Sequence, residues 1–245
     1  MEGEEGDTGN EYFSGDKKDL LIPESQRKLL TVLEKSAHKL ITVIAAGSSL
    51  NVSGGDAKVF AWYPGQAGGT ALAELLFGEK NFSGHLPLTF YRDISDLPPF
   101  EDYSMQNRTY RYFSGEPLYP FGYGLSYSHY SVCGAVQEGN TVRAEVINNG
   151  PMAGDALVQI YVRCDSPYAP LHPRLCGFGK ISLQPGEKKT ISVLLDPLTD
   201  TVISDTGEEI KAAGYTLYAG LSQPDEFSVR MCGSQPVEIK NRPKS

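Results

Sequence analysis

Apolar residues recur at helical spacing near the start of the chain and then give way to a nearly continuous apolar run. The stripe that follows Pro23 predicts a helix over residues 24–37. Its members are Leu29, Leu30, Val32 and Leu33. The run KLITVIAAG comes next and ends at Gly47. Because such a run is typical of a parallel strand covered on both faces, we expect a buried parallel strand here.

The same alternation of strand and helix continues further along the chain. The pattern predicts a short strand at residues 58–62, a glycine-rich turn and a helix over residues 67–77. The residues of this helix that we expect to face inward are Ala71, Leu72, Leu75 and Leu76. Residues 91–126 are rich in Tyr, Pro and Gly and lack a periodic run. The sequence therefore predicts an α/β region followed by an extended connector with buried aromatic side chains.

The pattern changes after about residue 130, where short apolar runs alternate with polar residues. Examples are NTVRAEVINNG, DALVQIYVRC, GFGKISLQPGEKKTISVLL and GYTLYAGLS. Turn sequences separate them, including Asn-Asn-Gly at 148–150 and Pro-Gly at 185–186. This spacing favours an antiparallel β-sandwich. We therefore expect two domains: an α/β domain over residues 1–126 that includes the connector at 91–126, and an all-β domain over residues 127–245.

Composition and charge exclude several classes of function. The 245 residues carry a net charge of -8 and contain no cluster of Lys and Arg, so we expect no nucleic-acid partner. The chain has no apolar run as long as a membrane-spanning helix, and we expect no membrane association. Met1 is not followed by a basic and then apolar leader, so we expect no signal peptide in this sequence.

Cysteine and histidine are too dispersed to indicate a metal site. The four cysteines are Cys133, Cys164, Cys176 and Cys232, and the four histidines are His38, His85, His129 and His172. Neither set has the close spacing of zinc or redox motifs. We expect buried free thiols, with disulfide bonds as the alternative, and no metal or cofactor.

Two further motifs have structural and ligand-binding interpretations. Gly65, Gly68 and Gly69 precede the second helix, but they lack the Lys-Ser/Thr of a phosphate-binding loop and the spacing of a dinucleotide fold. A tight strand-to-helix turn explains them better. No Gly-x-Ser-x-Gly motif of a serine hydrolase is present. Arg108 and Arg111 lie between tyrosines, where they either stack as structural groups or bind an anion.

The chain opens with an acidic run that contains Glu2, Glu4, Glu5 and Asp7. On sequence statistics alone, such a run is typical of a solvated terminal segment. Composition alone therefore assigns no function to these carboxyl groups.

Four phrases together resemble the C-terminal portion of glycoside hydrolase family 3, in particular its β-xylosidase, α-arabinofuranosidase and β-glucosidase members. They are LLIPESQRKLL, VFAWYPGQAGGTALAELLFGEKNFSGHLPLTF, RTYRYFSGEPLYPFGYGLSYSHY and GDALVQIYVRCDSP. The resemblance implies part of an α/β sandwich domain, with a parallel sheet and helices, followed by a fibronectin-III-like antiparallel β-sandwich. It covers the chain from about Glu2 to Leu221.

The resemblance also gives the acidic run a role. In xylosidase-like members, a loop similar to MEGEEGD reaches the sugar site and carries the general acid/base. By this pattern, one of Glu2, Glu4 and Glu5 is that residue, with Glu4 favoured and Glu11 a weaker candidate. Retaining glycosidases hold two carboxyl groups about 5–5.5 Å apart, one as nucleophile and the other as acid/base.

The catalytic nucleophile of the family is an aspartate on an N-terminal (β/α)8 barrel, which nothing in this chain resembles. A barrel of this type needs about 250 residues by itself. The resemblance therefore implies a partner, the missing barrel, and a chain that is inactive alone. An acid/base glutamate must start protonated, which requires burial or a neighbouring negative charge.

The sequence departs from the family pattern at two places. Asp16-Lys17 stands where the family commonly has Asp-Arg, and Lys17 cannot reproduce the planar bidentate contacts of arginine. His85 stands in the phrase Gly-His-Leu-Pro where the family commonly has Gly-Arg-Leu-Pro, and we expect a packing role for it.

Three hypotheses about function remain open on the sequence, and the last of them is an incomplete gene product of poor solubility that has no independent function. The first is a partial glycosidase whose substrate is an oligosaccharide or aryl glycoside with terminal β-xylosyl, α-arabinosyl or β-glucosyl residues, as in xylan breakdown. The second is a non-catalytic fibronectin-III-like module for structural packing, for homodimer contact or for association with carbohydrate. Full-length members of the family are often secreted or periplasmic, and the sequence itself leaves the location open.

Overall fold

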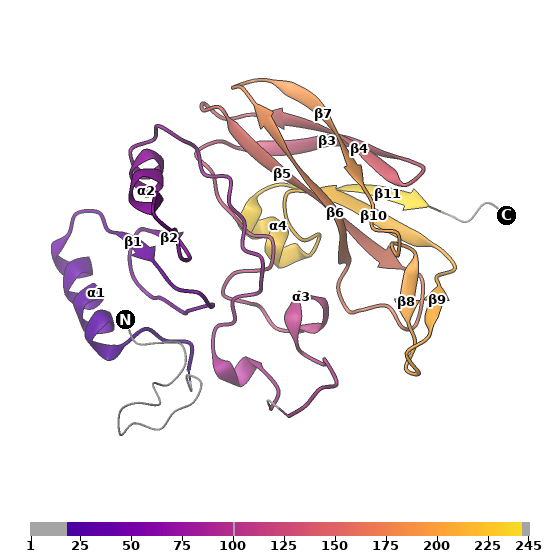
Figure 1. Ribbon diagram of the computed structural model, residues 1–245, viewed down its shortest axis with the longest axis horizontal. Helices are drawn as coiled ribbons and strands as arrows, with labels where there is room; N and C mark the ends of the chain where they lie inside the picture. The colour runs from indigo at the N-terminus through magenta and orange to yellow at the C-terminus, as the bar shows by residue number, and fades with distance from the viewer. Residues whose placement is uncertain (1–18, 100, 242–245) are drawn as a thin grey trace.

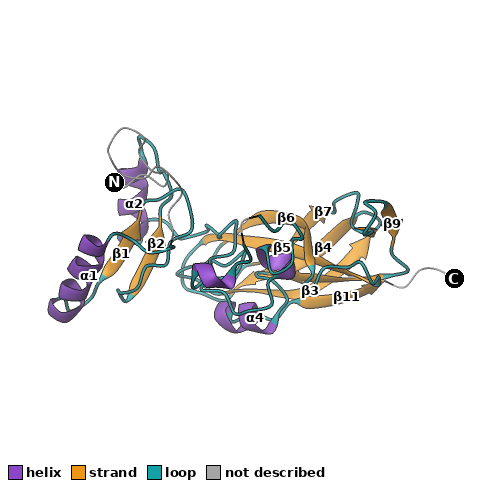
Figure 2. Ribbon diagram, turned by 90° about the horizontal axis from the view of Figure 1, so that it is seen from below, coloured by secondary structure: helices purple, strands orange, loops and turns teal. Residues whose placement is uncertain are grey.

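The computed structural model describes residues 19–99 and 101–241. The candidate acid/base residues Glu2, Glu4, Glu5 and Glu11 lie outside the described residues, as do Asp16 and Lys17. Figure 1 shows a small α/β region, a long connector and a β-sandwich in chain order. Viewed from below, the α/β region and the sandwich occupy opposite ends of the molecule (Figure 2).

The α/β region is built on a two-stranded parallel sheet. Helix α1 (Glu24–Ser36) precedes strand β1 (Ile41–Ile44), which pairs in parallel with β2 (Ala57–Phe60), and helix α2 (Gly68–Leu76) follows. Helix α1 begins after Pro23, whose fixed φ suits a helix start, and it carries an acidic first turn and a basic last turn. The α/β fold class predicted from the sequence is confirmed.

The apolar faces of this region are not covered as the sequence pattern led us to expect. Ile41 and Val43 on β1 are exposed, and so are Leu29 and Val32 on α1. On α2, Ala71 is exposed, while Leu72, Leu75 and Leu76 are half-buried. The prediction of a strand covered on both faces is therefore wrong for this chain, because two strands and two helices offer too little surface to enclose β1.

The connector is irregular but tightly packed where it meets the sandwich. It contains a 3-10 turn η1 (Ile94–Asp96) and one short helix α3 (Thr109–Tyr112). Phe113 is buried, and the buried Gln159 side chain donates to the carbonyl oxygen of Gly122 at 3.0 Å. These contacts confirm a packed connector, although Tyr103 on its outer part is exposed.

The C-terminal half is an antiparallel sandwich. One sheet has the order β11-β10-β5-β6 and the other has the order β3-β4-β7, while β8 and β9 form a separate hairpin. The strands are β3 (Tyr130–Glu138), β4 (Thr141–Asn148), β5 (Gly154–Cys164), β6 (Arg174–Leu183), β7 (Lys188–Leu194), β8 (Thr201–Ile203), β9 (Glu209–Lys211), β10 (Tyr215–Gly220) and β11 (Val237–Asn241). A fourth helix, α4 (Glu226–Cys232), precedes β11. The predicted all-β sandwich is confirmed.

The sandwich core follows directly from the alternation of apolar residues in its strands. On β4, the inward residues Val142, Ala144 and Val146 are fully buried, while the residues between them are exposed or half-buried. Strand β5 lies between β10 and β6 and is buried along most of its length. Side chains from both sheets form one continuous core, as expected when two sheets pack face to face.

One side chain joins the α/β region to the sandwich. The carboxamide oxygen of Asn81 accepts hydrogen bonds from the hydroxyl of Ser126 at 2.8 Å and from the backbone of Tyr127 at 2.9 Å. Its amide nitrogen donates to the carbonyl oxygen of Ala153 at 3.3 Å. The hydroxyl of Tyr127 in turn donates to the carbonyl oxygen of Leu75 at 2.9 Å, at the end of α2.

Candidate functional site

The residues that directly follow the acidic opening segment are fixed to the α/β region. The carbonyl oxygen of Leu20 accepts from the backbone nitrogen of Asn51 at 2.6 Å, and Leu21 forms a parallel bridge with Asn51. The side-chain amide of Asn51 donates to the carbonyl oxygen of Arg92 at 2.6 Å. These contacts therefore fix the start of the described chain, which directly follows the segment that contains the candidate glutamates.

The carboxyl ends of β1 and β2 form the part of the α/β region most suited to a ligand. In open parallel sheets, ligands bind beyond the carboxyl ends of the strands. Trp62 follows β2 and has a φ of 52°, a conformation that costs free energy for a residue with a bulky side chain. Its ring packs edge-on against Phe60 and Phe90. The neighbouring Tyr63 is 66% exposed.

The glycines after Tyr63 serve a tight turn, as the sequence indicated. Gly65 has a φ of 70°, which favours glycine. A Cβ on Gly68, the first residue of α2, would lie 2.5 Å from a side-chain carbon of Pro64. The positive φ explains Gly65 and the close approach of Pro64 explains Gly68, both without a phosphate ligand.

The two connector arginines differ in their environment. Arg108 donates from its guanidinium to the carbonyl oxygens of Pro99 at 2.7 Å and Asp102 at 3.1 Å, which makes it a structural group. The guanidinium of Arg111 lies over the ring of Tyr110, at 5.9 Å from its centre, and its side chain is exposed. The structural interpretation therefore fits Arg108, whereas Arg111 retains free donors for a ligand.

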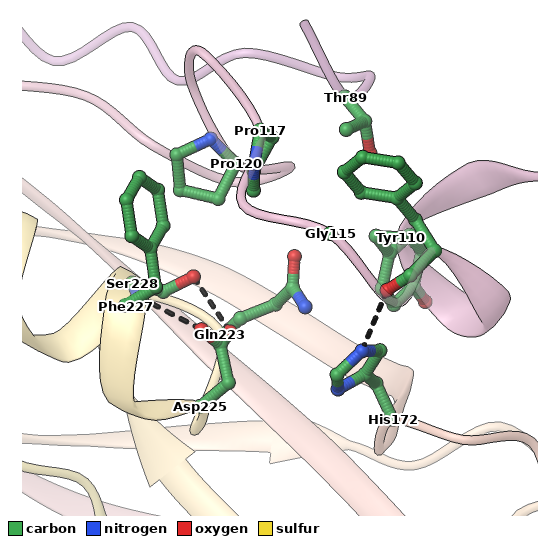
Figure 3. Close-up of a pocket in the computed structure, with 11 residues that line it drawn as sticks. Thr89, Tyr110, Gly115, Pro117, Pro120, His172, Gln223, Asp225, Phe227 and Ser228 are labelled. Atoms are coloured by element: carbon green, nitrogen blue, oxygen red, sulfur yellow. Dashed lines mark hydrogen bonds between the residues drawn. The ribbon is translucent and has the colours of Figure 1, made fainter. Parts of the chain in front are cut away.

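A small pocket lies between the connector and α4 (Figure 3). His172 points into it, with one ring nitrogen 2.9 Å from the carbonyl oxygen of Phe113. Asp225 caps α4, because its carboxylate accepts from the backbone nitrogen and the hydroxyl of Ser228. The pocket encloses about 40 Å³, far below the volume of usual ligand sites, and Thr89 on its wall is buried. It is too small for a sugar.

The structure gives His85 a packing environment. Its imidazole is mostly buried, with Nδ1 3.2 Å from the carbonyl oxygen of Ser83, and it lies against the backbone of Gly124. Burial lowers the pKa of this imidazole, and Lys180 adds to the effect. A neutral, enclosed imidazole agrees with the packing role expected from the sequence.

All four cysteines are free, and the expectation that they are buried is wrong for one of them. Cys164 and Cys176 are buried in the sandwich, Cys232 is half-buried, and Cys133 is exposed on β3. Burial raises the pKa of the Cys176 thiol to about 12, so this thiol remains protonated and unreactive. Cys133 is exposed because its side chain lies beside a bulge in the pairing of β3 with β4.

Within residues 19–99 and 101–241, no cluster of three or more His, Cys, Asp or Glu side chains has the arrangement of a metal site. None of the helices in that part of the chain combines the length and apolar character needed to cross a bilayer.

Sequence reasoning missed the contacts that define the edge of the parallel sheet. It identified the opening glutamates but not Asn51, Trp62 or Arg92. The positive φ of Trp62 has no sequence signal, because turns at such angles usually use glycine. Asn51 is an ordinary loop residue in the sequence, and only its backbone pairing with Leu20 reveals its position.

Comparison with known proteins identifies two regions of the chain. Residues 1–127 match the model of the glycosyl hydrolase family 3 C-terminal domain, and residues 156–223 match that of a fibronectin type III-like domain. The first match includes the acidic opening segment.

Curated relatives include a xylan 1,4-beta-xylosidase from Xylanibacter ruminicola, which is 40% identical over 80% of this chain and 24% of its own length. A thermostable beta-glucosidase B from Acetivibrio thermocellus is 35% identical over 93% of this chain and 34% of its own length. The chain thus spans about a quarter to a third of the length of these relatives.

Solved structures show the same fold. A beta-glucosidase from Streptomyces venezuelae in complex with D-glucose matches 92% of this chain and 32% of its own length, with a TM-score of 0.75 and 28% identity. A beta-glucosidase from Bifidobacterium adolescentis matches 92% of this chain and 36% of its own length, with a TM-score of 0.76 and 27% identity.

Proposed function

Because the chain belongs to glycosyl hydrolase family 3, we propose that it acts as the C-terminal part of a retaining glycoside hydrolase that removes terminal sugar residues. Its substrates are oligosaccharides with terminal β-xylosyl, α-arabinosyl or β-glucosyl residues. The names of its relatives, a xylosidase and a glucosidase, support the first and third of these sugars. The match of residues 1–127 to the family's C-terminal domain carries this proposal.

In this proposal, the two catalytic carboxyl groups come from two parts of the enzyme. A carboxyl group of the opening segment, with Glu4 favoured over Glu2 and Glu5, protonates the leaving oxygen and later activates water. The nucleophilic aspartate comes from a (β/α)8 barrel. Relatives three to four times as long as this chain support such a partner.

The exposed apolar side chains of the α/β region provide the surface for that partner. Leu29 and Val32 on α1 are 57% and 62% exposed, and Ile41 on β1 is 50% exposed. Each apolar group removed from water stabilises an interface by roughly 25 cal/mol per Å². In the proposed assembly, further chain covers this face.

The test combines this chain with the part of the Xylanibacter relative that its alignment does not cover. We expect the two parts, coexpressed, to hydrolyse nitrophenyl β-xyloside or nitrophenyl β-glucoside, and each part alone to be inactive. Leu29→Lys should reduce recovery of the complex. Activity of the 245-residue chain alone would contradict the division of catalytic groups between two parts.

Substitution of the opening glutamates identifies the acid/base. Glu4→Gln should lower hydrolysis of nitrophenyl glycosides by about 10²–10⁴-fold, because general acid/base catalysis contributes an effect of that size. A dinitrophenyl glycoside, whose leaving group needs no proton, should lose much less, and azide should restore turnover. Glu11→Gln is tested as the weaker candidate, and Glu79→Gln, at an exposed position after α2, is the matched control. If Glu2→Gln or Glu5→Gln shows this signature instead, the assignment moves to that residue.

The closed core of the sandwich favours a second candidate function, a non-catalytic module that folds and acts alone. This hypothesis requires a separate sandwich domain, and we propose that its boundary lies between residues 126 and 127. The module hypothesis predicts retention of residues 127–245 on insoluble xylan without the preceding region. A failure of this fragment to bind or to fold would eliminate it.

A further inference from the structure

An open groove of about 250 Å³ lies where the connector meets one end of the sandwich, separate from the α/β region. Helix α3 contributes Arg111 and Tyr112, strand β5 contributes Arg163, and β6 contributes Arg174. The loop between β5 and β6 adds aromatic and imidazole groups, and β8 closes the other side. This volume approaches that of a site for a small organic ligand and greatly exceeds that of one water molecule.

The groove is positively charged although the chain as a whole is acidic. Its lining contains three arginines and no Asp or Glu. Asp165 and Asp200 lie close enough to influence the groove residue Cys164, but Asp200 is already paired with Lys211 at 2.5 Å. In the described part of the chain, none of the three groove arginines has a carboxylate within ion-pair distance. An anion in the groove would therefore meet guanidinium groups that form no ion pair within the described residues, with Asp165 and Asp200 outside the lining.

The guanidinium groups are held in place but keep free donors. Arg174 donates to the carbonyl oxygen of Leu198 at 2.7 Å, and Arg163 donates to that of Leu171 at 3.4 Å. Arg111 rests over Tyr110. Each guanidinium has five N–H groups in a planar fork that matches the oxygens of a carboxylate or phosphate. The backbone contacts reduce the entropy lost when such a group binds.

The aromatic and apolar residues that line the groove favour a ligand that contains a ring over a free inorganic ion. Tyr168 is 40% exposed, and Tyr112 lines the same groove. Leu198, Val202 and Ile203 also line the groove, and Leu198 and Ile203 are exposed apolar residues. Aromatic side chains combine apolar faces with a polar edge, which favours contact with flat, partly polar molecules. A free inorganic anion would leave this surface unused.

From these features we propose that the groove binds an oxyanion carried on a ring of sugar size, with the anion at the arginines and the ring against the tyrosines. The shared chemistry is a carboxylate or a phosphate ester on a cyclic, hydroxylated body. The proposal rests on residues of the connector and the sandwich between Arg111 and Ile203, so it can be tested whether or not the proposed glycosidase activity is correct.

The test measures binding to the full chain by amide chemical shifts, with glucuronate and glucose 6-phosphate as the two anionic probes. We expect at least one of them to shift the signals of residues 163–174 and 198–203, and we expect binding to weaken as salt is raised. Comparison of the two probes distinguishes a carboxylate site from a phosphate-ester site. Absence of binding by both would overturn the proposal.

Two further probes separate the ring from the charge. Neutral glucose should bind at least tenfold more weakly than the tighter anionic probe, and so should inorganic phosphate. If glucose binds equally well, the arginines have no role as anion donors. If phosphate binds equally well, the tyrosines have no role, and the groove is only a region of positive potential.

Arg163→Gln and Arg111→Gln should each weaken binding about tenfold, as expected when a charge-assisted hydrogen bond is lost. Arg163 donates a long hydrogen bond of 3.4 Å to the carbonyl oxygen of Leu171, and Arg111 rests over Tyr110, so loss of either positioning contact should leave the fold intact. Arg143→Gln is the matched control, because Arg143 is an exposed sandwich arginine paired with Glu138. An equal loss in this control would show a general charge effect and overturn the groove as the site.

Discussion

Ile160 and Ile41 are the same type of residue on strands of the two regions, yet Ile160 is fully buried in the sandwich and Ile41 is 50% exposed. The sandwich has two sheets whose inner faces cover each other. In residues 19–99 the α/β region has a sheet of two strands, β1 and β2, and part of its apolar surface meets water. The contrast shows that a correct local pattern produces a closed core only when enough chain is present to cover both faces.

The largest effect that distinguishes the two regions is the loss of a core isoleucine. Ile160→Ala should lower the free energy of unfolding by about 2–5 kcal/mol, because it removes buried contacts and leaves a cavity. Ile41→Ala should change it by less than about 0.5 kcal/mol. Urea unfolding followed by circular dichroism measures both variants. Similar losses would mean that Ile41 is covered and that the contrast is wrong.

Trp62 allows the two regions to be followed separately in the same experiment. It is the only tryptophan of the chain and lies in the α/β region. We expect its fluorescence to change at a lower urea concentration than the circular dichroism signal of the sandwich strands, since the region around it has fewer buried side chains. Coincident transitions would show that the molecule unfolds as one unit.

Much of the fold could be predicted from the sequence because period and turn chemistry are local properties. The alternation in β4 and the apolar stripe of α1 each gave the correct element. Burial could not be predicted in the same way, because whether Ile41 is covered depends on other strands. The position of the candidate site could not be predicted either, because the contact of Asn51 with Arg92 joins loops that are distant in sequence.

The next largest effect tests the connection between the regions. Asn81→Ala removes hydrogen bonds to Ser126, Tyr127 and Ala153, of which Ser126 and Ala153 are half-buried, so we expect a loss of about 1–3 kcal/mol. Limited proteolysis should then cut the connector faster than in the parent chain. Asn149→Ala is the control, because the side chain of Asn149 is exposed and donates only to the hydroxyl of Ser131.

If the Asn81→Ala variant resists proteolysis as well as the control, the regions are joined by other contacts. The bond from the Tyr127 hydroxyl to Leu75 is the first alternative, and Tyr127→Phe removes it without changing the ring. The two variants together show which contact transmits stability from the sandwich to the α/β region.

The smallest effect concerns pH, and it comes from His85, which lies between α2 and the connector and which Lys180 on β6 also influences. Burial lowers the pKa of His85 in the folded chain, whereas in the unfolded chain it stays near 6.5. Between these two values the unfolded chain binds more protons, so stability is fully present above about pH 6.5 and decreases as pH falls toward the folded pKa. The buried thiols of the sandwich stay protonated throughout this range, because burial raises the pKa of Cys164 and Cys176.

Lowering the pH from about 7.5 to about 5.5 should therefore move the Trp62 transition to lower urea by more than the sandwich transition. This window lies above the range in which Asp56 and Asp93 titrate, since hydrogen bonds lower the pKa of both carboxyls. His85→Asn should remove the dependence, and substitution of the exposed His38 by Asn should preserve it. A shift of both transitions by equal amounts would show instead that the two regions unfold as one unit at every pH.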